Sequence, residues 1–410
     1  MLKVNLIKNF EDFYECMRIL HKVRKSILNA ILHAERIKIR DLVTLERIKH
    51  KLEEIPKTDE LYKLKSLQNE DIILELDYEL GEIKKDSIFL KFGPKALKDH
   101  MCEIHSNYQN EVDAGLKFLK KFEFDHFITD RDGTISNYCG RYRSSVQSIY
   151  NALCLSGFSK AVNGKSIILT SAPLFHHGLE EVSIQSQDEY ILSGSKGREI
   201  LIENNKHNFP LAKDEKEKLQ ELENEISHLL EDDDFSVFKH IGSGFQIKFG
   251  QITLARQDKN HSIKEEKSQN LKIIIQNLIK GIDPERTYFG IEDTGYDLEI
   301  MLKIKSQRNT LEEFDKGHGF KFIMNELQVN LKNKTILICG DTASDVPMLK
   351  AAQELGANVL SVFVTNDEKL KDLVSSVCER SHFVSSPDVL VYMLYKYAEK
   401  QNDLNSIIYY

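Results

Sequence analysis

Hydrophobic residues in the first 115 positions recur three or four residues apart, with charged residues between them. Met17, Leu20, Val23, Ile27 and Ile31 form one such stripe. This spacing is typical of one face of an α-helix that packs against a neighbour. The region is therefore predicted to be helical.

Turn-forming residues divide this helical region. Pro56 marks a turn, after which a second helical run is predicted from Asp59 to Leu80. Gly93-Pro94 marks another break, and a last helix is expected over roughly 95–121. Residues 1–115 are expected to form an all-α helical bundle, the N-terminal domain.

From Phe124 onward the pattern changes to short apolar runs bounded by polar or glycine residues. Four such runs lie at 124–130, 165–171, 334–341 and 358–365, with helical stretches after them. Buried parallel strands have this pattern, and alternation of strand and helix favours an α/β fold with a parallel sheet. We expect a Rossmann-like core formed by residues 122–174 and 311–410.

The long segment between the second and third runs does not fit a single crossover connection. It contains its own alternating segments, such as GFQIKFGQITLA, and an amphipathic helix at 271–284. We interpret residues 175–310 as an inserted α+β domain.

Composition narrows the class of protein. A chain of 410 residues is long enough for two or three domains. With 64 acidic and 56 basic residues and a net charge of −8, it is not expected to bind nucleic acid. The six cysteines form no CxxC pair, and no stretch resembles a signal peptide or a membrane span. These features predict a cytoplasmic protein that contacts no membrane.

Two acidic motifs follow apolar runs and carry the candidate chemistry. Asp130 and Asp132 stand in DRDGT, where one acid can act as a nucleophile and the other as a general acid. Asp341 and Asp345 stand in GDTASD and could share a hard cation such as Mg²⁺ with the first pair. The structural alternatives are a polar turn for DRDGT and a helix N-cap for Asp345.

Two further polar residues are uninformative alone. Thr170 ends the second apolar run and Lys316 precedes a predicted helix. Hydroxyls at strand ends and lysines beside glycines are common.

Taken in order, these four motifs resemble those of the haloacid dehalogenase superfamily of phosphotransferases. Within it, the chain is similar to the trehalose-6-phosphate phosphatase family, in the branch with a helical N-terminal domain. The segments that carry this closer resemblance are SGSKGRE at 193–199, GSGFQIK at 242–248, ITL at 252–254, Glu299, and DTASDVP at 341–347. Three positions depart from the family pattern, namely Arg131, Gln246 and the segment 255–257.

The resemblance implies a role for each core motif residue. Asp130 would attack phosphorus, Asp132 would protonate the leaving sugar oxygen, and Thr170 with Lys316 would bind the phosphoryl oxygens. Mg²⁺ would be held by Asp130, Asp132 and Asp341, with Asp345 supporting the metal waters or orienting Lys316. The side chain of Arg131 is expected to point away from its two acidic neighbours.

The resemblance also implies that the inserted domain, 175–310, is a cap domain, and it implies a substrate whose hydroxyl groups residues of this cap would bind. The expected function is Mg²⁺-dependent hydrolysis of trehalose 6-phosphate. The cap residues expected to contact the sugar are Lys196, Glu199, Gln246, Lys248, Gln257 and Glu299.

Two alternatives stay open: a phosphatase of another sugar phosphate, or a helical interaction protein with a retired phosphatase domain. The complete set of motif acids argues against the second. The N-terminal helices are a candidate surface for self-association or for a protein partner. Since every motif residue follows Phe124, the chemistry is not expected to need residues 1–115.

Overall fold

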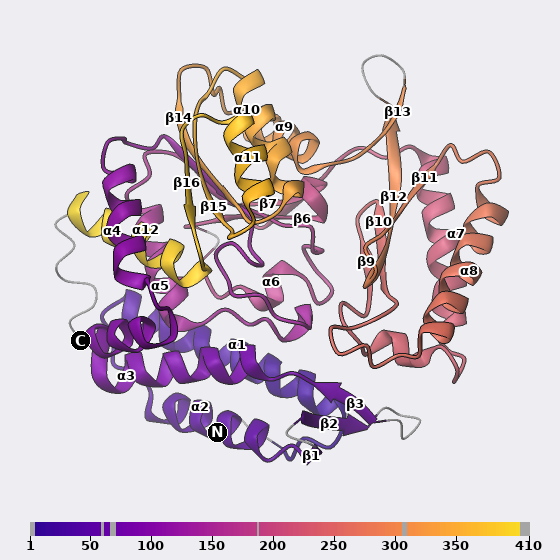
Figure 1. Ribbon diagram of the computed structural model, residues 1–410, viewed down its shortest axis with the longest axis horizontal. Helices are drawn as coiled ribbons and strands as arrows, with labels where there is room; N and C mark the ends of the chain where they lie inside the picture. Colours follow the sequence, from indigo (N-terminus) through magenta and orange to yellow (C-terminus); the bar gives the residue numbers. More distant parts are fainter. Residues whose placement is uncertain (1–4, 59–60, 66–70, 187, 306–309, 402–410) are drawn as a thin grey trace.

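The computed structural model describes residues 5–58, 61–65, 71–186, 188–305 and 310–401. Figure 1 shows a helical N-terminal part along the lower edge, a central sheet with its helices above it, and an inserted α+β part at the right. Among the described residues, no helix is both long and apolar enough to cross a membrane.

The N-terminal part contains four helices and a small sheet. The helices are α1 Phe10–Leu32, α2 Ile39–Glu53, α3 Asp77–Ile104 and α4 Tyr108–Leu119; the strands are β1 Lys57–Thr58, β2 Leu61–Lys65 and β3 Asp71–Leu74. The apolar stripe of α1 is buried, as its spacing predicts. Gly93 has φ 82° and interrupts α3 next to Pro94, where the sequence predicts a break.

The prediction of a helix from Asp59 to Leu80 is wrong for most residues of this range that the structure describes. Asp59 itself lies outside the described residues. Strands β2 and β3 pair antiparallel there, with Leu64 opposite Ile72. Each of these two side chains is 2% exposed. A short apolar run is compatible with the period of a helix and with that of a strand. Here the strand is favoured, because cross-strand pairing buries these side chains.

The core is an eight-stranded sheet in the order β16-β15-β14-β4-β5-β6-β7-β8. The first six strands of this order, from β16 to β6, run parallel to one another. Strands β7 and β8 extend one edge of the sheet and pair antiparallel. The bounds are β4 His126–Thr129, β5 Ser166–Leu169, β6 Ile191–Gly194, β7 Glu199–Ile202, β8 Asn205–Asn208, β14 Thr335–Gly340, β15 Asn358–Val364 and β16 Ser381–Val384.

Helices cover both faces of this sheet, as parallel strands require. Helices α3, α4, α5 and α12 contribute to one apolar cluster with the strands, and α9, α10 and α11 to the other. The bounds are α5 Ile149–Ser159, α6 Leu179–Val182, α9 Lys316–Glu326, α10 Val346–Glu354, α11 Glu368–Val377 and α12 Pro387–Gln401. The predicted fold class is confirmed.

The inserted part is an antiparallel sheet covered by two helices on one side. Its strand order is β11-β12-β10-β9, and β13 pairs with β12. The bounds are α7 Lys213–Leu229, α8 Glu265–Ile282, β9 Phe245–Lys248, β10 Gln251–Ala255, β11 Phe289–Asp293, β12 Asp297–Lys305 and β13 Leu311–Glu313.

The boundaries of the cap differ from the predicted 175–310. Strands β6 to β8, which fall inside that range, belong to the core sheet, whereas β13 just beyond it pairs in the cap. Local alternation shows that a segment is a strand but not which sheet edge it joins, because that choice depends on tertiary pairing.

The N-terminal part packs directly on the core through buried polar contacts. Arg24 of α1 lies 2.7 Å from Asp86 of α3 and donates to the carbonyl of Val146 at 2.6 Å. Lys85 of α3 lies 3.0 Å from Asp388 at the start of α12. The bond from Arg24 to Val146 and the ion pair of Lys85 with Asp388 join α1 and α3 to the core.

Candidate active site

Three neighbouring parallel strands carry the candidate residues to one edge of the core sheet. Asp130 follows β4, Thr170 follows β5 and Asp341 follows β14. In the register of the sheet Thr129 lies beside Cys339 and Ile168, so the residues after these strands converge. Ligands of open α/β sheets bind at this carboxyl edge.

Lys316 joins the acids at this edge. Its Nζ lies 2.5 Å from Asp130 Oδ1 and 2.5 Å from Asp345 Oδ1. Lys316 is the first residue of α9, where the side chain of Asp315 caps the helix by accepting from His318 N–H. All three charged side chains of this ion-paired group are buried.

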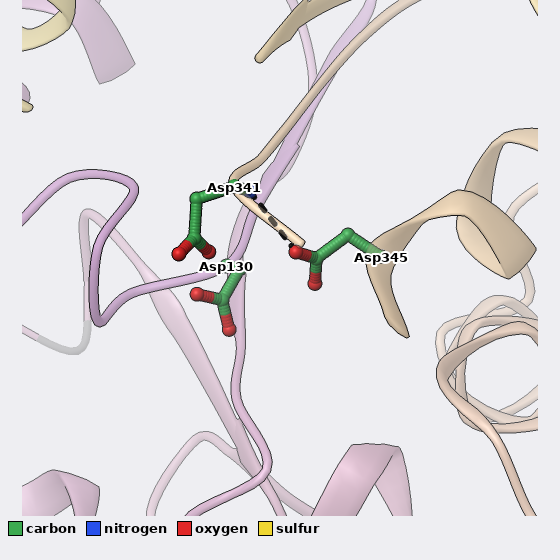
Figure 2. A group of neighbouring side chains, drawn as sticks. All are labelled: Asp130, Asp341 and Asp345. Atoms are coloured by element: carbon green, nitrogen blue, oxygen red, sulfur yellow. Dashed lines mark hydrogen bonds between the residues drawn. The ribbon is translucent and has the colours of Figure 1, made fainter. Parts of the chain in front are cut away.

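Asp341 faces Asp130 across the turn that follows β4. Figure 2 shows the carboxylates of Asp130 and Asp341 side by side, with Asp345 beyond them. The Thr134 hydroxyl lies 3.0 Å from Asp341 Oδ1 and 3.3 Å from Asp130 Oδ2. Gly133 has φ 87°, and a Cβ at this position would lie 2.1 Å from Asp341 Oδ2. The turn therefore requires glycine, both for its backbone conformation and for the approach of Asp341.

Burial and the charges of neighbouring carboxylates raise the pKa of both facing acids. Burial is the main cause of the raised pKa of Asp130, which the ammonium of Lys316 opposes. Burial, followed by the charge of Asp130, raises the pKa of Asp341. Two buried carboxyl groups that disfavour each other's ionised form need a positive charge between them to be ionised together.

These residues fit a hard divalent cation. Oxygen atoms of Asp130, Asp341 and Asp345 lie within 4.8 Å of one another, and carboxylate oxygens are the ligands that such cations take. Asp345 already accepts from Lys316 and from the backbone N–H groups of Asp341 and Thr342. Asp130 and Asp341 are therefore the acids best placed to bind a cation, and Asp345 is better placed to orient Lys316.

Arg131 differs from the prediction that its side chain points away from the neighbouring acids. It is buried, its Nη1 donates to Asp132 Oδ1, and its guanidinium also bonds the hydroxyl and carbonyl of Ser145. The cause is the sharp turn after β4, which ends the extended alternation that would separate neighbouring side chains. Arg131 thus holds one oxygen of Asp132.

The motif residues line a pocket between the core and the cap, with a volume of about 240 Å³. The lining residues include Asp130, Asp132, Thr170, Lys316 and Asp341 from the core, and Ser243, Gln246 and Lys248 from the cap. All four predicted catalytic residues therefore come together, opposite the start of the cap sheet.

Two of the six predicted sugar-binding residues, Gln246 and Lys248 of β9, line this pocket. Glu299 lies beside them, with Oε1 3.7 Å from Lys248 Nζ. Lys196 bonds Met301 in the same region, 3.1 Å from Nζ to Sδ. These four residues form a group at the interface of core and cap.

Lys196 and Glu299 lie next to the pocket without lining it. The remaining two predicted residues, Glu199 and Gln257, bond elsewhere. Glu199 of β7 accepts from Leu174 N–H and the Ser195 hydroxyl and pairs with Lys206 at 2.6 Å. Both ends of the Gln257 amide are hydrogen-bonded within its own loop. Its Nε2 donates to the carbonyl of Ile263, and its Oε1 accepts from the N–H groups of Asp258 and Ile263. Their polar atoms hold the fold, so we remove both from the sugar-binding set.

Sequence reasoning missed the loop that follows the DRDGT motif. Tyr138, Cys139, Gly140 and Tyr142 from this loop line the pocket, as does Ser243 of the cap. The position of the loop directly after the first motif was the available signal; nothing in its composition indicates a binding role.

Similar proteins cover most of the chain. It is 30% identical over 418 residues to alpha,alpha-trehalose-phosphate synthase (UDP-forming) 2 of Caenorhabditis elegans, covering 95% of this chain and 34% of that protein. The chain thus spans about a third of the length of this relative. It is 28% identical to the trehalose-phosphatases of C. elegans and Brugia malayi, covering 93% and 94% of this chain and 94% and 85% of those proteins.

Solved structures are similar at lower identity. The C-terminal domain of trehalose-6-phosphate phosphatase from Candida albicans matches with 13% identity and a TM-score of 0.46, covering 70% of this chain and 96% of that chain. The enzyme from Aspergillus fumigatus matches with 14% identity and a TM-score of 0.41, covering 70% and 98%.

Family models match both main parts of the sequence. The model described as trehalose-6-phosphate phosphatase, C-terminal, covers residues 127–390, which include all the motif acids. The model described as the trehalose-6-phosphate phosphatase N-terminal helical bundle domain covers residues 9–108. The chain therefore belongs to the trehalose-6-phosphate phosphatase family.

Proposed function

We propose that this protein is a Mg²⁺-dependent phosphatase that hydrolyses trehalose 6-phosphate to trehalose and phosphate. The observation that carries the proposal is the convergence of Asp130, Lys316 and Asp341 on one pocket that the cap strand β9 also lines. A phosphoryl group at the acids would leave the attached sugar facing the polar side chains of β9.

Asp130 is the proposed nucleophile. Its carboxylate oxygen would form a bond to phosphorus while the bond from phosphorus to the sugar oxygen breaks. The ammonium of Lys316, 2.5 Å from Asp130 Oδ1, is within reach of a phosphoryl oxygen placed there. Thr170 lines the same end of the pocket and would donate its hydroxyl to another phosphoryl oxygen.

Asp132 is the proposed general acid and base. It would donate its proton to the departing sugar oxygen and then accept a proton from the water that attacks the phosphorus of the aspartyl-phosphate. That second attack breaks the bond to Asp130, releases phosphate and restores the carboxylate. Arg131 would keep Asp132 in place through both steps, because it already holds one of its oxygens.

Asp130 and Asp341 would hold Mg²⁺, with the backbone carbonyl of Asp132 as a further ligand. When bound, the cation supplies positive charge that neutralises the phosphoryl oxygens and permits Asp130 and Asp341 to be ionised together. Asp345 would act through Lys316, whose Nζ lies 2.5 Å from its Oδ1.

Gln246 and Lys248 are the proposed direct contacts of the sugar hydroxyls. Lys196 and Glu299 would support them, since Glu299 Oε1 lies 3.7 Å from Lys248 Nζ. Gln246 also donates to the carbonyl of Ser243 at 3.0 Å, which leaves its amide oxygen available to a substrate hydroxyl.

A panel of phosphorylated sugars, with Mg²⁺ present and released phosphate measured, tests the substrate. Trehalose 6-phosphate should have the highest kcat/KM, and Asp130→Asn serves as the matched inactive control. Preference for a different sugar phosphate would overturn the substrate but keep the phosphatase. No phosphate release from any member would favour a non-catalytic interaction protein.

A further inference from the structure

A second cleft lies where the N-terminal part, the core and the cap meet. We call it the junction cleft; its volume is about 180 Å³. It is lined by Tyr14 of α1, by residues 141–143 and 176–177 of the core, and by Lys239 and residues 242–247 of the cap. Tyr142, Ser243 and Gln246 line both this cleft and the catalytic pocket.

Three basic side chains line the junction cleft, those of Arg141, Arg143 and Lys239, together with the imidazoles of His176 and His177. His177 Nδ1 lies 3.2 Å from Glu181 Oε2, and burial lowers the pKa of His177. Within the part of the chain that the structure describes, no carboxylate forms an ion pair with Arg143 or Lys239. Arg143 instead lies over the ring of Tyr14, 3.9 Å from its centroid.

Two buried polar atoms of the cleft residues have no hydrogen-bond partner among the described residues. They are Arg141 Nε and the Tyr142 hydroxyl oxygen. Arg141 is 6% exposed, donates from Nη2 to the carbonyl of Ile73 at 2.7 Å, and lies near the ring of Phe10. A buried donor without a partner is costly, which favours a ligand that accepts from it.

A neighbouring histidine also reflects the local excess of positive charge. His240 stacks on Phe10, with the ring centroids 5.3 Å apart. Burial, followed by the charges of Lys239, Arg141 and Arg143, lowers the pKa of His240 to about 4. The potential around the cleft thus disfavours an added cation and favours an anion.

We propose that the junction cleft binds the phosphate group of a small molecule at a site separate from the catalytic pocket. Guanidinium groups bind phosphate oxygens with paired, charge-assisted hydrogen bonds, and here two are supplied from one loop. Lys239 would contribute a third positive charge from the cap. A bound phosphate would therefore contact Tyr14, the core loop and the cap at once, and would tie the cap to the N-terminal part.

Calorimetric titration of the full chain with orthophosphate, in the presence of Mg²⁺, tests this site. The wild type should bind two phosphates, one in each pocket. Arg143→Gln and Lys239→Gln should each weaken one of the two events at least tenfold and leave the other unchanged. Glycerol phosphate, a monoester, should show the same dependence on these two residues.

Arg380→Gln is the matched control, because Arg380 also lies over an aromatic ring, that of Phe122 at 5.8 Å, outside the cleft. It removes the same charge and should leave both binding events unchanged. Lys239→Gln keeps the test decisive if Arg143→Gln disturbs the packing on Tyr14, and thermal melting of each variant checks the fold. A single binding event in the wild type, equally strong in both cleft variants, would overturn the proposal and assign the phosphate to the catalytic pocket.

Discussion

The ammonium group of Lys316 lies between two buried carboxylates, those of Asp130 and Asp345. One positive charge cannot neutralise these two acids and Asp341 as well. The excess negative charge is what makes the site receptive to a cation, and it also requires that each acid be held by other groups. Asp345 is held by backbone N–H groups and Asp341 by Thr134.

Replacing Asp130 by Asn should abolish turnover and leave the fold nearly unchanged. Asn has almost the same shape but cannot form the aspartyl-phosphate. The rate of phosphate release should fall by more than about a thousandfold, on the order of what loss of a nucleophile costs. A variant that retains a rate within tenfold of wild type would contradict the assignment of the nucleophile.

Replacing Arg131 by Met should lower both stability and kcat. Removal of the guanidinium leaves Asp132 and the carbonyl of Ser145 without their partner. The side chain of Asp132 is 23% exposed, so the loss should cost less than the ~3–5 kcal/mol of a fully buried ion pair. Asp132 would also lose its fixed orientation. Denaturant unfolding measures the first effect and single-turnover kinetics the second.

Arg131→Lys is the control for this experiment, since it keeps the charge but not the paired geometry. It should recover part of the stability and less of the kcat. Unchanged kcat in Arg131→Met would show that Arg131 has only a structural role.

Among the elements, the strands of the cap sheet direct alternate side chains to its two faces, one that packs on helices and one that is polar. Ile252 and Leu254 of β10 pack with Ile300 of β12 against the helices α7 and α8, and the alternate positions carry polar side chains. In the register of the sheet Gln246 lies opposite Thr253, which lies opposite Glu299. A strand with period two thus presents one apolar face to the cap helices and one polar face to the opposite side.

Replacing Lys248 or Glu299 by Ala should reduce specificity more than chemistry. If Lys248 holds a sugar hydroxyl and Glu299 holds Lys248 in place, each loss costs about 1–3 kcal/mol, or roughly ten- to a hundredfold in kcat/KM for trehalose 6-phosphate. Hydrolysis of an aryl phosphate, which has no such hydroxyls, should fall far less. Glu199→Gln is the matched control, because the carboxylate of Glu199 is hydrogen-bonded within the core and does not line the pocket. Equal losses for both substrates would show that Lys248 and Glu299 are structural.

At the scale of the whole molecule, the N-terminal part supports the loop that follows the first motif. Glu79 of α3 accepts from Cys139 at 3.7 Å, Arg141 bonds Ile73 of β3, and Arg24 of α1 bonds Val146. This loop lines the catalytic pocket, so the helical part contributes to the shape of the site without reaching the substrate.

Removing residues 1–115 should therefore lower turnover, contrary to the expectation from motif positions alone. The truncated chain should also melt at a lower temperature and aggregate, because the removal exposes apolar surface of α5. The kcat for an aryl phosphate, measured on the soluble fraction, is the readout. Arg24→Leu in the full chain cuts one of the contacts and should show a smaller effect in the same direction. A soluble truncated protein with unchanged kcat would contradict this prediction.

Divalent cations should affect both activity and stability. Chelator-treated protein should be inactive, and Mg²⁺ should restore turnover and raise the melting temperature, since it relieves the repulsion between Asp130 and Asp341. Ca²⁺ should restore the melting temperature better than turnover, because its looser shell can engage both oxygens of the nucleophile. Full turnover in excess chelator would exclude a metal-dependent mechanism.

The fold class and the family could be predicted from the sequence. Apolar runs that alternate with helical stretches favour a parallel sheet, and polar residues that end such strands gather at its carboxyl edge. That local rule places Asp130, Thr170 and Asp341 together, and the structure agrees. The roles of these residues stay predictions until they are measured.

Only the tertiary structure decided which polar residues are available to a substrate. Glu199, Gln246 and Gln257 are all predicted to bind the sugar, yet of these three only Gln246 lines the catalytic pocket. Glu199 is bonded by the backbone N–H of Leu174, and Gln257 bonds the carbonyl of Ile263 in its own loop. The orientation of Arg131, the β2–β3 hairpin and the support of the loop at 138–142 also depend on contacts between residues far apart in the chain. No local pattern encodes such contacts, since they exist only when the chain is packed.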